Sequence, residues 1–381
     1  MSKDTAIKSY QVVGKVEDMT DFITALDPDQ TLLTNKFGKA TVTSTEHSWL
    51  CDALRPAKIN KTLESVDFET ANATPRKRAS NYTQQFLHGY TVTDTTQAIK
   101  KYGVRDEAAY QMVKASKEVG RDLELALVAN STKVLGDDAT AGQFGGLPYF
   151  LTNFQNVTVG TLSGIITLTA HKFVTGDAVI LAATALDANY KPNIHYFVHV
   201  IDADTFTIHD TAVDAEANTG AIIPASAQSG LTLTYNNAIN AANFSTAGKF
   251  TFEGLNDAMQ AAWKRGGSID CAIMSGKNKR IASGFTDGVT KTRPMEAKTV
   301  VSVVDVIETD FGRIDLLAHR LYEDDVVDLL ELQYWKLGYL IPFHVESVPR
   351  KGTYQEKVIT GSATLECTAP TSSARIYGIT G

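Results

Sequence analysis

The sequence predicts a mixed α+β fold in which extended arms are joined to a folded body. Three observations predict it. A polar, threonine-rich extended stretch at 79–94 leads into a long amphipathic helix, short β-patterned segments fill 157–235, and helices and strands alternate from 252 onward. The extended stretch has little core of its own. We therefore expect a subunit that finishes folding against copies of itself.

The composition narrows the class of protein. A chain of 381 residues can hold two or three domains. Hydrophobic residues at 43% and charged residues at 21% are typical of a soluble globular protein. A net charge of −7 argues against a dedicated nucleic-acid binder. No segment approaches the roughly 20 apolar residues that cross a bilayer, and no apolar secretion signal opens the chain, so we expect synthesis in the cytosol and no membrane partner.

The first hundred residues hold too little apolar surface for a compact domain. We expect a short helix at 18–26, which Asp27-Pro28 stops, and a β-branched, strand-like segment at 39–50. Residues 55–80 are polar and include the basic run Arg76-Lys77-Arg78. A stretch of this length without regular structure is unusual inside a single compact domain. We therefore expect this segment to make contacts between molecules.

The long helix is predicted from Asp106 to Val134. Lys114 and Glu118 are spaced for an i,i+4 ion pair on its polar face. Steps of three and four residues place small or apolar side chains on one stripe, which consists of Ala108, Met112, Ala115, Val119, Leu123, Ala126 and Leu127. A glycine-rich loop follows at 136–148.

The pattern of residues 157–235 predicts a small all-β barrel or sandwich. We expect it to be an inserted domain, because the segments before and after it form a sensible continuous fold when it is left out. Asp202 to Asp204 join two of its strands as a hairpin. The expected strands are 161–169, 178–182, 194–202, 205–209 and 230–235.

The rest of the chain is mixed α/β. We expect a helix at 252–264 whose buried face carries Leu255, Met259, Ala262 and Trp263. A short helix is expected at 277–282, and a hairpin turns around 310–312. The remaining expected strands are 269–275, 299–309, 313–321, 326–332, 335–347 and 356–367.

No constellation of catalytic residues emerges. The Asp-Phe-Gly at 310–312 lacks the other kinase motifs and reads as a tight turn, while the phosphate-binding loop GxxxxGK[ST] and the hydrolase motif GxSxG are absent. Cys271 and Cys367 lie in apolar strand patterns and read as core, and Cys51, Cys271 and Cys367 fit free thiols in a reducing compartment. We expect no enzyme activity and no cofactor.

A metal site in the β-rich segment is also not expected. His195 and His199 are four residues apart, which on a strand separates them by about 13 Å, too far to share one ion. Together with His171 and His209, they read as surface or cross-strand histidines.

Several short motifs occur in a fixed order along the chain. They are SYQVVGKVEDM at 9–19, TSTEHSWLCDAL at 43–54, ASNYTQ at 79–84, GVRDEAAYQ at 103–111, RDLELAL at 121–127, GGLP at 145–148, GSID at 267–270, SGKNKR at 275–280, and DFG at 310–312 followed by YWK at 334–336. In this order they resemble the major capsid proteins of tailed bacteriophages with the Hong Kong 97-type shell fold. Apart from 155–236, the resemblance covers nearly the whole chain.

The resemblance implies a division of the chain and a set of partners. It implies an N-terminal arm (1–50), an extended loop (51–103), a peripheral domain with the spine helix (104–154 and 347–381), an axial domain (237–346) and an inserted β domain (155–236). It also implies self-assembly into pentamers and hexamers, a separate scaffolding protein, a portal, double-stranded DNA held without sequence specificity, and a place in the virion.

The arms carry aromatic and basic side chains that suit contacts between subunits. We expect these contacts at Tyr10, Trp49, Arg76, Lys77, Arg78, Tyr82, Phe86 and Tyr90. Two other functions stay open at this point. One is an encapsulin-like shell that encloses cargo, and the other is carbohydrate binding through the β domain, for which Tyr190, Tyr196, Phe197 and Tyr235 are the candidate aromatics.

Overall fold

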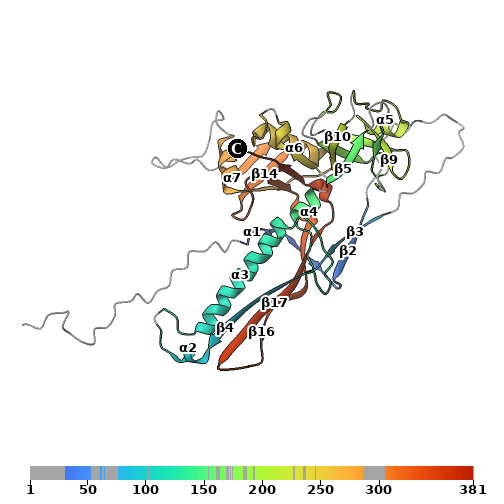
Figure 1. Ribbon diagram of the computed structural model, residues 1–381. Helices are drawn as coiled ribbons and strands as arrows, with labels where there is room; N and C mark the ends of the chain where they lie inside the picture. Colours follow the sequence, from blue (N-terminus) through green and yellow to red (C-terminus); the bar gives the residue numbers. More distant parts are fainter. Residues whose placement is uncertain are drawn as a thin grey trace, which may run out of the picture. The chain divides into compact units, whose positions relative to one another are not determined.

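The structure is a computed structural model with a mixed α+β architecture (Figure 1). It describes residues 31–52, 61, 64, 76–101, 103–152, 154–159, 164–168, 171, 173, 175–182, 187–191, 194–225, 228–234, 237–244, 246–285 and 305–380. Tyr10, the helix expected at 18–26 and most of 53–75 lie outside these residues.

The described chain divides into two compact units. The first contains Leu87–Gly120 and His344–Thr360, and the second contains Gln30–Phe86, Arg121–Phe343 and Gly361–Gly381. Four elements continue from one unit into the other, namely the strands β4 (Gln84–Thr93), β16 (Trp335–Ser347) and β17 (Tyr354–Cys367) and the helix α3 (Glu107–Ala129).

The apolar stripe predicted for helix α3 is confirmed, and a capping residue explains where the helix begins. Ala115, Val119 and Leu123 are buried, and the predicted pair of Lys114 and Glu118 forms at 3.8 Å between Nζ and Oε1. The helix starts at 107 because the Asp106 carboxylate caps it, accepting a hydrogen bond from the N–H of Ala109 at 3.1 Å.

The predicted C-terminal end of this helix, at 134, is wrong, because α3 ends at Ala129. The N–H of Gly146 donates to the carbonyl of Asn130 at 2.9 Å, so the following loop replaces the next helical turn. A Cβ at Gly146 would lie 2.5 Å from the carbonyl oxygen of Leu127. Only glycine permits the loop to approach the helix this closely.

The first unit holds the short helix α2 (Asp94–Ala98), which the sequence did not predict. The Thr93 hydroxyl caps it by accepting from the N–H of Thr96 at 3.2 Å. Lys101 pairs with Glu107 at 3.0 Å, and the imidazole of His88 lies 2.8 Å from the Glu118 carboxylate. These contacts connect the segment after α2 to the start of α3 and β4 to the middle of α3.

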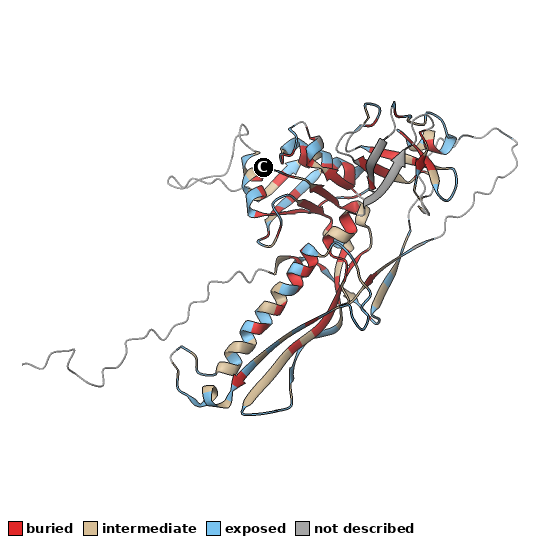
Figure 2. Ribbon diagram, viewed as in Figure 1, coloured by how far each residue is buried: buried red, intermediate tan, exposed pale blue. Residues whose placement is uncertain are grey.

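A four-stranded sheet runs in the order β1-β16-β17-β4, where β1 (Gly38–Thr41) lies parallel to β16. The sequence predicted the bounds of β16 correctly. It expected one strand-like segment at 39–50, whereas the structure breaks this segment into β1 and β2 (Glu46–Cys51), with Val42 buried between them. Figure 2 shows that burial along β16 and β17 decreases toward the turn that joins them.

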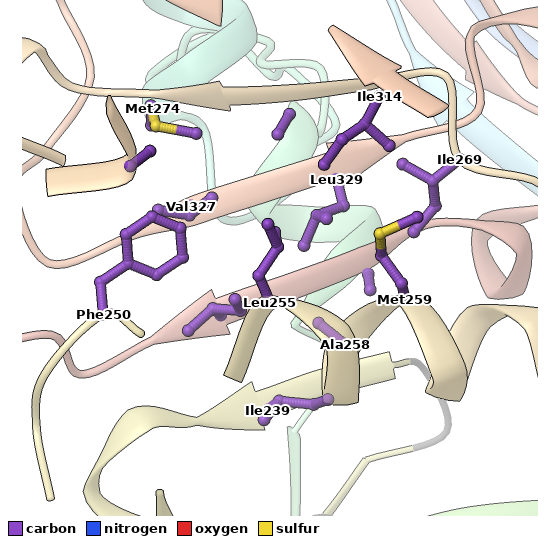
Figure 3. Packing of buried hydrophobic residues seen from close by; sticks show 14 of the residues in the cluster. Ile239, Phe250, Leu255, Ala258, Met259, Ile269, Met274, Ile314, Val327 and Leu329 are labelled. Atoms are coloured by element: carbon purple, nitrogen blue, oxygen red, sulfur yellow. The ribbon is translucent and has the colours of Figure 1, made fainter. Parts of the chain in front are cut away.

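The main core lies under a six-stranded sheet of order β11-β18-β15-β12-β14-β13. Its strands are β11 (Asn237–Asn240), β12 (Cys271–Met274), β13 (Val306–Thr309), β14 (Gly312–Ala318), β15 (Val327–Leu330) and β18 (Ala374–Tyr377). The helix α6 (Phe252–Lys264) has the bounds that the sequence predicted, and α7 (Gly276–Gly284) extends the short helix expected at 277–282. Figure 3 shows Leu255 and Met259 of α6 packed with Val327 and Leu329.

A closed barrel occupies the segment that the sequence predicted as all-β. Its strand order is β10-β5-β6-β9-β8-β7. The strands are β5 (Phe154–Val159), β6 (Ile166–Thr167), β7 (Ala178–Ala182), β8 (His195–Val200), β9 (Thr205–His209) and β10 (Gln228–Thr234), and α5 (Ala212–Ala217) is a helix that the sequence did not predict. The expected hairpin turn forms, because the Asp202 carboxylate accepts from the N–H groups of Asp204 and Thr205 at 2.8 and 2.7 Å.

The barrel is connected to the six-stranded sheet by polar contacts. The imidazole Nε2 of His195 lies 3.0 Å from the amide oxygen of Asn237 in β11, and the Arg265 guanidinium donates to the carbonyl of Ala178. Burial, followed by the charge of Arg265, lowers the pKa of His195 to about 4. The imidazole is therefore neutral at pH 7 in this contact.

Further short elements complete the described chain. They are α1 (Leu32–Lys36), β3 (Lys77–Tyr82), α4 (Leu147–Leu151) and the 3-10 turns η2 (Ala241–Asn243), η3 (Leu332–Tyr334) and η4 (Pro370–Ser372).

Candidate intersubunit surfaces

The strands β2 and β3 form a two-stranded antiparallel ribbon. Glu46 lies opposite Tyr82, and Cys51 lies opposite Lys77. Alternation along the strands puts His47, Trp49 and Cys51 on one face. Neither strand has a second partner strand among the residues that the structure describes, so β2 keeps an open backbone edge, while on β3 side chains bond the carbonyls of Ser80 and Tyr82.

The base of this ribbon is held by Asn81, which is fully buried. Its amide nitrogen donates to the carbonyls of Gly145 and Leu365 at 2.9 and 2.8 Å, and its amide oxygen accepts from the N–H of Gly145 at 2.8 Å. The Thr364 hydroxyl donates to the carbonyl of Tyr82 at 2.7 Å. These bonds tie the ribbon to β17 and to the loop before α4.

Lys133 holds the opposite side of the ribbon base. Its ammonium donates to the carbonyl of Ser80 at 2.7 Å and lies 5.4 and 5.6 Å from the ring centroids of Tyr82 and Tyr149. Tyr82, one of the predicted contact residues, is therefore engaged within its own chain.

Trp49 also packs within its own chain. Its ring centroid lies 5.6 Å from that of His47 and 6.1 Å from that of Phe150, which in turn contacts Trp335 at 5.8 Å. The imidazole of His47 lies 2.9 Å from the Glu366 carboxylate. The half-buried Trp49 thus anchors β2 to α4 and β16, and whether it also contacts a neighbouring subunit stays a prediction.

Phe86 is almost fully buried. It is 7% exposed, and its ring contacts Phe144 at 6.4 Å and Phe343 at 5.9 Å between centroids. This placement leaves little surface for a neighbouring subunit. Tyr90 is half-buried, and burial and the nearby Asp106 raise its pKa.

Arg76 and Arg78 are the most open of the predicted contacts whose side chains the structure describes. The side chains of Arg76 and Arg78 are 69% and 62% exposed, and they lie 3.7 Å from Asp52 and 3.4 Å from Glu46, respectively. Exposed pairs of this kind contribute roughly 0–1 kcal/mol. Lys77 is placed in β3 by its backbone. Leu50, 64% exposed opposite Arg78, is a further outward residue that the sequence interpretation missed.

A buried carboxylate fixes the start of the described chain. Glu124 of α3 is fully buried and accepts from the N–H groups of Leu33 and Thr34 at 2.5 and 3.1 Å and from the Thr34 hydroxyl at 2.7 Å. The imidazole Nε2 of His319 lies 3.0 Å away. Burial alone would raise the pKa of Glu124, but the bonds from His319, Thr34 and Leu33 outweigh it and lower the pKa.

Trp263 contradicts the sequence prediction. It was expected on the buried face of its helix, but it is 58% exposed, and its ring contacts Phe311 with centroids 5.8 Å apart. Leu255, Met259 and Ala262 do occupy the buried face. Trp263 lies one residue, or 100°, beyond Ala262 and next to the helix end, where it reaches the β13–β14 turn instead.

The barrel histidines each have a local partner. His195 and His209 are buried, so they are not surface residues. The Nδ1 atoms of His199 and His209 lie 2.7 Å from the carbonyls of Ala215 and Thr219, respectively. Within the described ranges, no group of three or more His, Cys, Asp or Glu side chains is placed to hold a metal ion.

Two further observations concern the whole of the described chain. Cys51, Cys271 and Cys367 are free thiols, as expected, and Cys271 and Cys367 are buried. Among the helices within the described ranges, none is both long enough and apolar enough to span a bilayer.

The sheets and the long helix form a fold that is also found in phage capsid subunits. The capsid asymmetric unit of cyanophage A-1(L) aligns with a TM-score of 0.62 at 10% identity, covering 98% of this chain and 99% of that one. The capsid of an empty GTA particle aligns with a TM-score of 0.53 at 9% identity, covering 98% and 97%. At these identities the likeness shows the fold.

The sequence comparison shows the family. The model of the SU10 major capsid protein family matches residues 4–380, so the chain belongs to this family. It is also 33% identical over 140 residues to the major capsid protein of Escherichia phage Phieco32. That match spans 36% of this chain and 40% of the relative's length.

Proposed function

We propose that this chain is the major capsid protein of a tailed phage and that its copies assemble into pentamers and hexamers of an icosahedral head around double-stranded DNA. The observation that carries the proposal is the family match over residues 4–380. The likeness in fold to capsid subunits supports it. The proposed role is structural and includes no catalytic step.

The parts of the chain take separate roles in this proposal. Residues 1–50 are the N-terminal arm, 51–103 the extended loop, 104–154 and 347–381 the peripheral domain, and 237–346 the axial domain. Residues 155–236 are an inserted domain on the outer surface. The ribbon of β2 and β3 supports the loop assignment, because its base is anchored by Asn81 while the outer edge of β2 can pair with a strand of the next subunit.

The arm and loop contacts are expected at the side chains that remain open. Arg76 and Arg78 are more than half exposed, and they lie on the ribbon beside the exposed Leu50. Residues 84–93 pair as β4 within the chain's own sheet, so the part of the loop available to a neighbour lies before them. Phe86 is better explained as core than as a contact.

The proposed partners follow from the same role. A separate scaffolding protein and a portal would guide the closure of the shell, and the assembled protein would be part of the virion after synthesis in the host cytoplasm. The net charge of −7 suits DNA that is enclosed rather than bound, because strong phosphate binding requires many Lys and Arg contacts.

The two alternative functions have less support. The family match favours a viral shell over an encapsulin-like compartment. For sugar binding through the barrel, aromatic rings would have to be exposed. Tyr190 and Tyr196 are only 2% and 0% exposed, so they belong to the barrel core. Phe197 is half-buried, and Tyr235 lies outside the described residues.

Electron microscopy tests the proposal. The chain is expressed alone and with a candidate scaffolding protein, and the particles are viewed by negative stain while light scattering gives their mass. Closed polyhedral shells, or rings of five and six subunits, are expected. A monodisperse monomer under every condition would contradict the proposal.

A further inference from the structure

A hollow with basic and apolar walls lies in the turn between α2 and α3, within the first unit. Its volume is about 530 Å³. Its walls include three apolar residues, Ala98, Ile99 and Val104, and three basic residues, Lys100, Lys101 and Arg105. None of the described residues that line it is acidic, and Ile99 is 59% exposed. An exposed apolar side chain among cations suits an acidic partner that has an apolar face.

The frame of this hollow is fixed by contacts within the subunit. The Gln97 amide nitrogen donates to the Asp106 carboxylate at 2.7 Å, and the Gln97 amide oxygen accepts from the N–H of Ala108 at 3.3 Å. Lys101 pairs with Glu107 at 3.0 Å. Because the turn is already held against the start of α3, little binding free energy is lost in ordering it when a partner binds.

Two cations of the hollow remain available to a partner. The adjacent carboxylates are engaged elsewhere, since Asp106 caps α3 and Glu107 pairs with Lys101. Lys100 and Arg105 are exposed, and within the described ranges neither side chain forms an ion pair. Their charges are therefore open to an acidic group from outside the turn.

The N-terminal segment 16–29 has the matching pattern. It precedes the described residues, which start at Thr31, and it contains five carboxylates and no Lys or Arg. Steps of three and four residues place its apolar side chains on one helical face, namely Val16, Met19, Phe22, Ile23 and Leu26. A segment of this kind binds with its apolar face in a groove and its charged side at the rim.

The walls of the hollow favour such a protein segment over the phosphates of DNA. Ala98, Ile99 and Val104 offer apolar surface, which a phosphate backbone cannot use. Strong phosphate binding also requires many Lys and Arg contacts, whereas only Lys100 and Arg105 are open here.

We propose that the hollow at 97–105 of one copy binds the acidic segment 16–29 of a neighbouring copy. The apolar face of the segment packs on Ile99 and Val104, and its carboxylates face the two open cations. The segment and the hollow are different parts of the chain, so this contact can pass from each copy to the next around a ring of five or six. The inference rests on the proposed function, and it names the two parts that meet in one contact between subunits.

Charge reversal tests the contact. Lys100→Glu combined with Arg105→Glu should lower the yield of shells at least about tenfold, because like charges then face each other across the contact. Glu17→Lys combined with Asp21→Lys should do the same from the other side. A chain that carries all four substitutions should recover shell formation, which a merely structural role of these residues would not produce. Lys351→Glu, at an exposed position of the same unit, is the matched control and should assemble normally.

Cross-linking identifies the occupant of the hollow. Shells are assembled from a mixture of isotopically labelled and unlabelled chains that carry a photoreactive benzoylphenylalanine at position 99. After irradiation, the cross-links should map to 16–29, and products that join a labelled to an unlabelled peptide should form. Such mixed products show that the segment comes from a neighbouring copy.

Several results would overturn the inference. They are cross-links confined to single chains, cross-links to another region of a neighbour or to DNA, normal assembly of the Lys100→Glu, Arg105→Glu chain, and no recovery in the chain with all four substitutions. Thermal unfolding of the unassembled variants should match the wild type, which separates assembly from folding. A wild-type chain that never forms shells would instead overturn the proposed function, and this inference with it.

Discussion

The buried Glu124 shows how one side chain can organise distant parts of the sequence. Its carboxylate joins α1, α3 and the segment around His319, and each of its oxygens accepts from more than one donor. A buried charge with its hydrogen bonds satisfied is stable, but removing the charge leaves those donors unpaired.

Glu124→Gln is expected to lower the free energy of unfolding of the subunit at pH 7 by about 2–4 kcal/mol, because an amide cannot accept all of these bonds. The folded-state pKa of Glu124 is lowered, so its contribution is present above the usual value near 4.5 and is lost as the pH falls through the folded-state pKa. The difference between variant and wild type should therefore shrink at acidic pH in urea titrations.

Glu118→Gln on the same helix is the control for this prediction. Glu118 is 32% exposed and pairs with His88 and Lys114, so its loss should cost less than about 0.5–1 kcal/mol. Equal effects of the two substitutions would contradict the role of Glu124.

Phe86 lies in the extended arm, which suggests a contact between subunits, but its burial predicts that it stabilises its own subunit instead. Phe86→Ala should destabilise the subunit itself by about 3–5 kcal/mol, because it leaves a cavity between Phe144 and Phe343. Leu87→Ala, at a site 71% exposed on the same strand, should change stability by less than about 0.5 kcal/mol. Thermal unfolding of the two variants checks the contrast, and a stable Phe86→Ala subunit would point back to an intersubunit role.

At the scale of elements, the ribbon of β2 and β3 depends on its base. Asn81→Ala should cost about 2–3 kcal/mol, because it leaves the buried Gly145 and Leu365 groups without a partner. Hydrogen exchange at 46–51 and 77–82 should accelerate at the same time. Ser48→Ala, on an exposed position of the ribbon, should leave the exchange unchanged. Unaltered exchange in Asn81→Ala would show that other contacts hold the ribbon.

The elements with strong local signals could be predicted from the sequence. The helix α6 was predicted correctly because Thr251 caps its start, Gly266 follows its end, and apolar residues recur at helical spacing. The end of α3 could not be predicted, since Asn130 leaves the helix to bond with Gln84 and Phe144, which are distant in sequence. The alternation of side chains along a strand also could not reveal which face of the sheet is covered. Phe86 was therefore predicted to contact a neighbouring subunit, although it is buried in its own.

The exposed position of Trp263 was missed for a related reason. Its helical position lies beside the apolar stripe, and sequence spacing alone assigned it to the core. Its exposure depends on the position of the β13–β14 turn, where Phe311 covers one side of the indole. Only the tertiary structure brings these two residues together.

At the scale of the whole molecule, the net charge of −7 opposes the approach of identical subunits at pH 7. Raising the salt from about 0.01 to about 0.1 M shortens the screening length from about 30 to about 10 Å. Assembly, followed by light scattering, should therefore accelerate over this range. Assembly that slows with salt would show that attraction between oppositely charged surfaces dominates the approach of the subunits.

The carboxylate of Glu124 also has a consequence for how such sequences diverge. The Glu124 carboxylate satisfies donors from Leu33, Thr34 and His319 together. A substitution of Glu124 alone is therefore expected to be destabilising and not neutral in evolution. Glu124, Thr34 and His319 should be inherited as a set, and relatives that have lost the glutamate should show changes at the other two positions as well.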